Sequence, residues 1–241
     1  MTSITGLSPV TSQSEIKDEL TFVIGNLNKH YEILSKMFIY EYSQEAPVTK
    51  AIGAKPEEIK ESYLETCKES LNSQFSILAF SGDKCIGWVL NYITTEIKEC
   101  FEDPNLSFNS DFTAKIANKG YSNTKENKIS VVIDEISRNF SFFIPNCKKL
   151  FVLDVVFVQQ SFGGKGIATK LIKKSIELAR ENECDWIMAI PTNIKSAHIF
   201  SKFGFKCVRE IPFNEFKENG ETFLKDFKDG NKSVRLMFLK L

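Results

Sequence analysis

A chain of 241 residues suits one large domain that buries a single apolar core. Its 31 basic and 31 acidic residues leave no net charge, so it lacks the excess of positive charge that nucleic-acid and anionic-membrane binders carry. This balance favours a small-molecule ligand. We expect a monomer that has neither nucleic acid nor a membrane as its partner.

Cysteine and histidine are too scattered to predict a structural zinc site. The six cysteines stand singly, without a Cys-x-x-Cys pair, and His30 and His198 are the two histidines. We therefore expect no bound metal. The first residues have neither a signal-peptide pattern nor a long apolar run, which favours a cytoplasmic protein with reduced thiols.

The first half of the chain predicts a flexible leader followed by strands and helices. Residues 1–18 are polar and rich in Ser and Thr, so the folded domain is expected to span residues 19–241. Residues 97–147 are interpreted as an insertion that contains helix. Spacing and turn residues predict a strand at 20–25, helices at 28–42 and from Pro56 onward, and a hairpin of strands at 75–80 and 85–93.

The second half predicts alternating strands and helices. Residues 150–158, LFVLDVVFV, form a nearly continuous apolar run that is typical of a central strand covered on both faces. A helical stripe begins at Ile167. Further elements are predicted as a strand at 186–190, a helix at 196–203, and strands at 205–213 and 233–241. The predicted fold is a mixed α/β domain, with a twisted sheet of about seven strands and helices on both faces.

Three glycines, Gly163, Gly164 and Gly166, stand between the strand at 150–158 and the next helix. A helix N-terminus has unpaired N–H groups and a partial positive charge, and glycine lets an anion approach them. A tight turn also explains glycine, but three glycines in four positions favour a phosphate ligand. The spacing fits neither a nucleotide P-loop nor a dinucleotide fingerprint, which would need a glycine at Thr169.

The glycine segment resembles the acyl-coenzyme A loop of the GNAT superfamily of N-acetyltransferases, Gln/Arg-x-x-Gly-x-Gly/Ala. Gly166 and Ala168 match its last two positions, and Gly163 stands where Gln or Arg is usual. The segments Glu45-Ala46-Pro47-Val48-Thr49 and PFNEFKENGETFLKDF are similar to parts of the insect- and nematode-type arylalkylamine N-acetyltransferases. The segment from residue 193 to 205 resembles a second superfamily motif, N-x-x-A-x-x-x-Y-x-x-x-G-F. The residues that carry this resemblance are Asn193, Ser196, Ala197, Phe200, Gly204 and Phe205.

This resemblance implies that acetyl-CoA is the co-substrate. The backbone of Phe157 and Val158 would hold the pantetheine arm as an added strand does, and the pyrophosphate would lie on the amides of the glycine loop. The implied coenzyme-binding residues are Phe157, Val158, Gly163, Gly164, Lys165, Gly166, Ile167, Ala168, Thr169 and Asn193.

The resemblance also implies direct acetyl transfer to an amine. A base is needed because alkylamines are mostly protonated at neutral pH. The similar enzymes have a Glu directly before the Pro, where this chain has Ala46, so Glu45 is predicted to be the base and Glu41 is the alternative. Phe200 replaces the Tyr that donates a proton to the thiolate in many members, so two nearby hydroxyls become candidates. The predicted catalytic residues are Glu45, Ser196 and Thr192.

The implied acceptor is a small primary amine, and foremost an arylalkylamine such as dopamine, tyramine, octopamine or serotonin. Two alternatives stay open. One is a non-catalytic acyl-CoA-binding relative, since the positions of the base and of the Tyr have changed, and the other is an acetyltransferase for a polyamine or sugar amine. Phe38, Tyr40, Tyr42 and residues 140–143 are placed to contact an aromatic acceptor.

Overall fold

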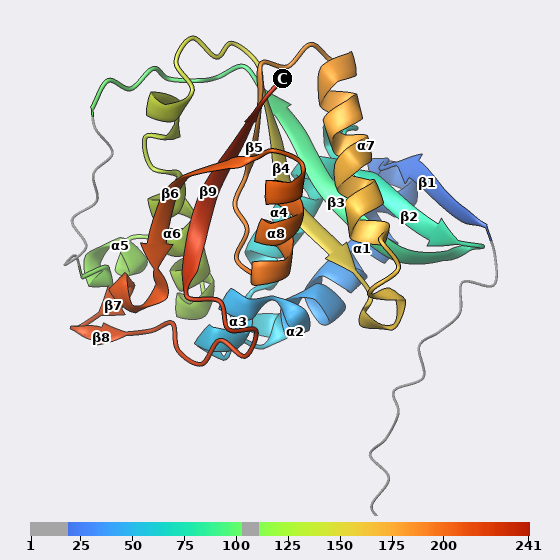
Figure 1. Cartoon of the computed structure of the whole chain (residues 1–241). Coiled ribbons are helices and arrows are strands. Elements are labelled where there is room, and N and C mark those ends of the chain that lie inside the picture. Colours follow the sequence, from blue (N-terminus) through green and yellow to red (C-terminus); the bar gives the residue numbers. More distant parts are fainter. Residues whose placement is uncertain (1–18, 103–110) are drawn as a thin grey trace, which may run out of the picture.

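The computed structural model describes residues 19–102 and 111–241 (Figure 1). The predicted leader, residues 1–18, lies outside the described residues. The strands are β1 (Leu20–Ile24), β2 (Ile77–Ser81), β3 (Lys84–Thr94), β4 (Leu150–Val158), β5 (Trp186–Ala189), β6 (Lys206–Pro212), β7 (Lys217–Glu218), β8 (Glu221–Thr222) and β9 (Ser233–Lys240). The helices are α1 (Leu27–Met37), α2 (Ser43–Glu45), α3 (Pro47–Ile52), α4 (Lys60–Asn72), α5 (Thr113–Ala117), α6 (Thr124–Ser137), α7 (Ile167–Glu181) and α8 (Ile194–Lys202).

Seven strands form one mixed sheet in the order β1-β2-β3-β4-β5-β9-β6. β4 and β5 are parallel, and the other neighbouring pairs are antiparallel. The apolar run LFVLDVVFV is β4, which lies at the centre of the sheet. The predicted seven-stranded mixed sheet is therefore confirmed, and the glycine loop follows its fourth strand.

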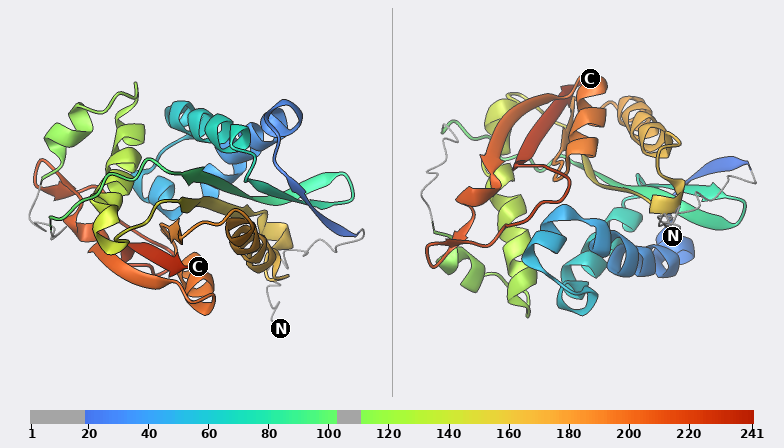
Figure 2. Two further views of the ribbon diagram at one scale, coloured as in Figure 1. Left: turned by 90° about the horizontal axis from the view of Figure 1, so that it is seen from above. Right: turned by 60° about the horizontal axis from the view of Figure 1, so that its bottom comes forward.

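Helices cover both faces of the sheet, as predicted (Figure 2). α7 and α8 lie on one face, where the apolar stripe of α7 joins Phe151 and Leu153 of β4 in a common core. α1, α4 and α6 lie on the other face. There α6 packs on a core cluster with Val152, and α1 and α4 pack on a second cluster with Phe157. β4 thus contributes side chains to every part of the core.

The range 97–147 contains α5 and α6. α6 presents Val131, Val132 and Ile136 to the sheet, where it packs beside β6 and β9. At its N-terminus the Asn123 side chain accepts a hydrogen bond from the backbone N–H of Lys125, which caps the first turn. α6 therefore covers the part of the sheet that α1 and α4 leave uncovered.

β4 leaves β5 halfway along its length. The parallel pairing joins residues 150–153 to residues 186–189, and it stops there. β3 continues to pair with β4 as far as Val158 on the other side. Residues 154–158 therefore present backbone groups that no described strand pairs on the β5 side. Among the described helices, none combines the length and the apolar character needed to cross a membrane.

Candidate active site

The glycine loop forms the junction between β4 and α7. After β4 a short 3-10 turn, η4 (Gln160–Phe162), leads into Gly164 and Gly166, whose φ angles are +75° and +73°. Glycine adopts this left-handed backbone without strain. A Cβ at either position would meet no protein atom within 4 Å, so the space beside the loop is open. The loop therefore offers exposed backbone to a ligand.

The first turn of α7 supplies the amides that the sequence predicts for phosphate. Ile167 is only 1 % exposed, so its side chain is held in the core while its N–H lies at the helix start. The first N–H groups of a helix have no intrahelical acceptor. The Gly163 N–H, by contrast, donates to the Gln160 carbonyl at 3.0 Å and is used within the turn. The amides available for an anion therefore begin beyond Gly163.

Two lysines lie beside the loop. The Nζ atoms of Lys84 and Lys165 are 5.3 and 5.2 Å from the centre of the Phe162 ring. Lys84 comes from the start of β3, far from the loop in sequence. Both cations therefore lie beside Phe162, the residue directly before Gly163, where the family motif usually has Gln or Arg.

The predicted pantetheine residues lie on the unpaired part of β4. The Phe157 ring is 5 % exposed and contacts the Tyr42 and Trp88 rings, with centroids 6.0 and 5.6 Å away. Val158 is half-buried against the α7 side of the core. Both side chains are engaged in packing, so only their backbone groups are free to hold a ligand.

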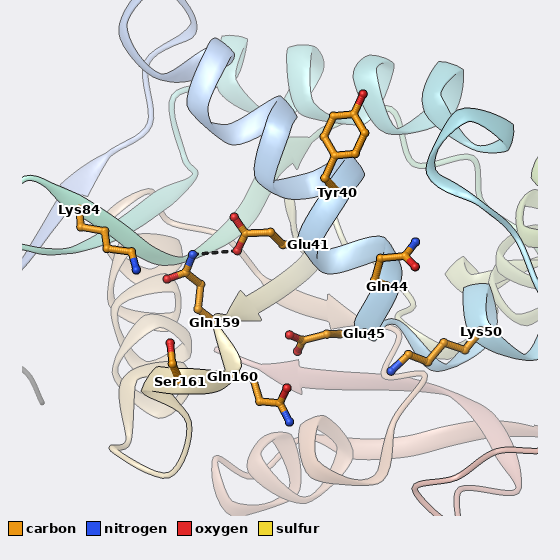
Figure 3. Close-up of a pocket in the computed structure, with 9 residues that line it drawn as sticks. All are labelled: Tyr40, Glu41, Gln44, Glu45, Lys50, Lys84, Gln159, Gln160 and Ser161. Carbon is orange, nitrogen blue, oxygen red and sulfur yellow. Dashed lines mark hydrogen bonds between the residues drawn. The ribbon is translucent and has the colours of Figure 1, made fainter. Parts of the chain in front are cut away.

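An open pocket of about 490 Å³ lies at the end of β4 (Figure 3). Its walls come from the segment after α1, from β3 and from the start of η4. The lining residues are Tyr40, Glu41, Gln44, Glu45, Lys50, Lys84, Gln159, Gln160 and Ser161. Two carboxylates, two lysines and one aromatic ring make this pocket suitable for a small cationic or zwitterionic molecule.

A π-helical turn, η1 (Phe38–Tyr42), places the two carboxylates of this pocket. It follows α1 directly and continues into α2, which ends at Glu45. The Glu41 carboxylate accepts a hydrogen bond from Gln159 Nε2 at 2.8 Å, which ties this segment to the end of β4. The buried Ala46 caps α3, and Pro47 follows at its first position. Ala46 is therefore the N-cap residue of α3 and does not line the pocket. The two carboxylates that do line it, Glu41 and Glu45, precede Ala46 in the chain.

The Glu45 side chain points into the pocket from the end of α2 (Figure 3). Partial burial raises the pKa of this carboxyl above its ordinary value, and Glu41 adds to the rise, while Lys50 and Lys195 oppose it. A carboxylate with a raised pKa is a better proton acceptor. Glu45 thus has the exposure and the charge environment of a base, and its catalytic role stays a prediction.

The predicted residues around α8 hold the start of that helix. The Asn193 side chain accepts a hydrogen bond from the Ser196 N–H at 2.8 Å and so is the N-cap. The Thr192 carbonyl accepts from Asn231 Nδ2 at 2.9 Å. The hydroxyls of Ser196 and Thr192 make no hydrogen bond within the described part of the chain. His198 is exposed.

Replacing Asn193 with alanine is expected to lower the free energy of unfolding by about 1 kcal/mol, because the N-cap hydrogen bond to Ser196 is lost. Urea unfolding measures this change. Asn193→Ser, which keeps a capping oxygen, should retain most of the stability. An alanine variant as stable as the wild type would contradict the capping role. A change in the KM for acetyl-CoA in both variants would support the predicted contact with the coenzyme.

The aromatic residues predicted for the acceptor pocket are divided between core and pocket. Phe38 is 2 % exposed and stacks on Tyr63 with ring centroids 4.4 Å apart. Tyr40 is 55 % exposed and lines the pocket, and Tyr42 is half-buried behind it. Residues 140–143 lie beside α6 and do not line this pocket.

Asp154 and Gln159 were not predicted from the sequence. Gln159 holds Glu41 in place, and its residue type alone carries no signal for that role. Asp154 is the one charged residue in β4, within a run that is otherwise apolar. A single carboxylate in the predicted central strand was a signal, because such a strand is covered on both faces and a buried charge is costly.

Comparison with known proteins identifies the family. The model of the Acetyltransferase (GNAT) family matches residues 31–205, which is well over half of the chain. The chain belongs to the GNAT acetyltransferase family. The predicted family, and with it the acetyltransferase activity, is thereby confirmed.

Solved structures of GNAT enzymes share this fold. Arylalkylamine N-acetyltransferase 2 from Aedes aegypti is 22 % identical, with 92 % of this chain and 99 % of that chain covered and a TM-score of 0.75. A Drosophila melanogaster polyamine N-acetyltransferase, which forms N-acetylagmatine, is 13 % identical, with 92 % and 100 % covered and a TM-score of 0.69. At these identities the likeness shows the fold alone.

Acetyl-CoA is the co-substrate that the GNAT family implies, and the residues present fit it. The unpaired edge of β4 can take an extended arm, and the open glycine loop at α7 can take phosphates. Bound there, acetyl-CoA supplies the thioester whose acetyl group is transferred. In the described ranges, no group of three or more acidic, Cys or His side chains could hold a metal ion.

Proposed function

We propose that this GNAT N-acetyltransferase acetylates the primary amine of a small arylalkylamine such as tyramine, dopamine, octopamine or serotonin. The observation that carries the proposal is the pocket at the end of β4, whose lining includes Glu41, Glu45 and the exposed Tyr40. Carboxylates attract an ammonium group, and an aromatic side chain packs against an aryl group. The likeness to the Aedes aegypti arylalkylamine enzyme supports the same acceptor class.

In this proposal the chain acts mainly by positioning. The β4 edge and the glycine loop hold the coenzyme, and the pocket holds the amine, so that the two reactants meet in a fixed geometry. Glu45 is the sequence-based candidate for the base. Ser196 and Thr192 are the candidates for protonating the thiolate.

A second candidate acceptor is a diamine or an aminoalkyl guanidine. Glu41 and Glu45 are four residues apart and line the same pocket, so they can bind two positive charges of one flexible molecule. The structural neighbour that forms N-acetylagmatine supports this candidate. The two acceptor classes differ in whether a ring or a second cation provides the binding energy.

A panel of amines separates these candidates. We expect the highest kcat/KM for tyramine, dopamine or serotonin, and lower values for putrescine, spermidine, agmatine and glucosamine. Phenethylamine against butylamine is the matched pair, because both carry one ammonium. Burial of an aryl ring contributes about 1.5–3 kcal/mol, so phenethylamine should be favoured by roughly 10- to 100-fold. Thiol release from acetyl-CoA measures these rates.

The outcome of the panel decides between acceptors and tests the enzyme. A preference for agmatine or putrescine over every aryl amine would contradict the arylalkylamine proposal and favour the dication. The control is the rise in melting temperature with acetyl-CoA, which reports coenzyme binding without any acceptor. A protein that shows this rise but acetylates no amine would contradict the proposed function as a whole.

A further inference from the structure

Asp154 occupies a β-bulge in the centre of the sheet. Leu90 pairs with Val155 and Asn91 pairs with Leu153, so Asp154 is the extra residue that no β3 residue opposes. Leu153 faces the core beneath α7. Side chains alternate along a strand, so Asp154 faces the opposite side, the face of α1, α4 and α6. The bulge thereby turns a carboxylate toward the seam between the two core clusters of that face.

The Asp154 carboxylate has no partner. Within the described residues it makes no hydrogen bond and no ion pair. Three titratable groups from the surrounding elements face it, namely Tyr42 of η1, Tyr92 of β3 and Glu69 of α4, and none of them is a cation. The hydroxyls of Tyr42 and Tyr92 are also without hydrogen bonds there. Its negative charge is therefore not balanced by a cation or a hydrogen-bond donor of the described residues.

Water reaches the Asp154 side chain even though the surrounding protein is dense. The side chain is solvent-exposed, which in the middle of a central strand means that open space lies above it. Burial by the surrounding protein, followed by the negative charge of Glu69, raises the pKa of Asp154 to about 6. The carboxylate is therefore ionised at neutral pH, accessible to a small molecule, and able to accept a proton.

The position of Asp154 along β4 places it near the reacting atoms. It is the first residue beyond the part of β4 that pairs with β5, and the glycine loop lies at the other end of this free edge. A coenzyme whose phosphates bind the loop would extend its arm along residues 154–158, which would place the thioester toward Asp154. The pocket that Glu45 lines with Gln159 and Gln160 lies at the end of the same strand.

We propose that Asp154 is a catalytic residue that binds the ammonium group of the acceptor and removes its proton, an inference that rests on the proposed N-acetyl transfer. The proton passes from the ammonium to the carboxylate, the freed electron pair forms the C–N bond, and the C–S bond breaks. A second proton leaves the nitrogen as the thiolate is protonated. Asp154 then returns its proton to water, so each turnover gives an amide, free CoA thiol and one proton.

The test is the pH dependence of kcat/KM for Asp154→Asn with the best acceptor of the panel. In the wild type, activity should fall tenfold per pH unit below about pH 6, where Asp154 is protonated and cannot act as a base. The variant should lose about 100-fold or more in kcat/KM near neutral pH. Its remaining activity should rise with pH toward the pKa of the amine, because only amine that is already neutral can react.

A second variant tests the pKa of Asp154 without replacing Asp154 itself. Glu69→Gln removes the anion that raises the Asp154 pKa, so the acid limb of the profile should move to lower pH. The matched control is Asp134→Asn, which makes the same chemical change on an exposed part of α6 and should leave both the rate and the profile unchanged. Asp154→Asn should keep the acetyl-CoA-induced rise in melting temperature, because the glycine loop is intact.

Stability provides an independent readout of the same group. The Asp154 pKa is raised in the folded protein, so ionisation above about pH 6 subtracts from stability. Asp154→Asn should therefore melt above the wild type at pH 7.5, and the difference should shrink as the pH falls toward the ordinary pKa of Asp, about 4.

Three outcomes would overturn the inference. An active wild type whose Asp154→Asn variant keeps its rate and its acid limb would overturn it and leave the proposed function standing. An acid limb that Glu45→Gln removes and Asp154→Asn leaves in place would assign the base to Glu45 instead. A wild type that acetylates no amine in the panel would overturn the proposed function and the inference together.

Discussion

Replacing Gly166 with leucine is expected to abolish the binding of acetyl-CoA. Gly166 precedes the first turn of α7, and the space where its Cβ would stand is empty of protein. A leucine side chain would fill the space in front of the helix amides and keep phosphate oxygens from reaching them. Wild-type protein at a ligand concentration 100 times the Kd should gain about 2.7 kcal/mol in stability, and the variant should gain none. Thermal melting with and without acetyl-CoA measures the difference.

The control for this substitution must share its backbone strain. Gly166 has a φ of +73°, which a leucine adopts at a cost of about 1 kcal/mol. Gly230, in the turn before β9, has a φ of +75° and also has no atom within 4 Å of an added Cβ. Gly230→Leu should lower the melting temperature by a similar amount and still respond to acetyl-CoA. A Gly166→Leu variant that keeps the full response would show that the phosphates lie elsewhere.

Patterns that are local in sequence predicted most of the fold. The apolar run of β4 and the helical stripe of α7 each report burial directly, since both elements face core along their length. The π-helical turn at Phe38–Tyr42 was predicted only as the end of a helix. Apolar spacing of three and four residues suits an α-helix and its π-turn equally, so the shift in hydrogen-bond partners leaves no local sequence pattern. In the structure Phe38 of this turn contacts the rings of Tyr63 and Trp88.

The candidate site also contains one part that the sequence predicts and another that it does not. The glycine loop could be predicted because the residue type itself permits the left-handed backbone at Gly164 and Gly166. The bulge at Asp154 could not, because it arises from the register of β4 against β3, and at the bulge the paired residues are more than sixty positions apart in sequence. Lys84, the first residue of β3, lies near the loop because β3 pairs with β4. Local patterns thus located the phosphate end of the site, and tertiary pairing set the rest.

A methionine at Arg209 is expected to lower the free energy of unfolding by about 3–5 kcal/mol. Arg209 lies in β6 and is 7 % exposed. Its Nη1 donates to the carbonyls of Glu135, Ile136 and Arg138 at 3.4, 3.0 and 2.6 Å, and these carbonyls end α6. The last carbonyls of a helix have no intrahelical donor and carry partial negative charge, so a buried cation there satisfies both needs.

The expected loss of stability in Arg209→Met comes from the carbonyl groups that lose a hydrogen-bond donor, and not from a loss of packing. Methionine fills much of the arginine volume and keeps the contact with Phe143, whose ring centre is 5.2 Å from the guanidinium carbon, so packing changes little. The carbonyls of Ile136 and Arg138, however, lose the guanidinium donor where water has little access, while the Glu135 carbonyl keeps the Arg138 N–H at 3.4 Å. Urea unfolding should show a lower midpoint for Arg209→Met and a change within about 0.5 kcal/mol for Arg180→Met, since Arg180 is exposed on α7. A loss below 1 kcal/mol for Arg209→Met would show that water replaces the guanidinium and that α6 ends without help from β6.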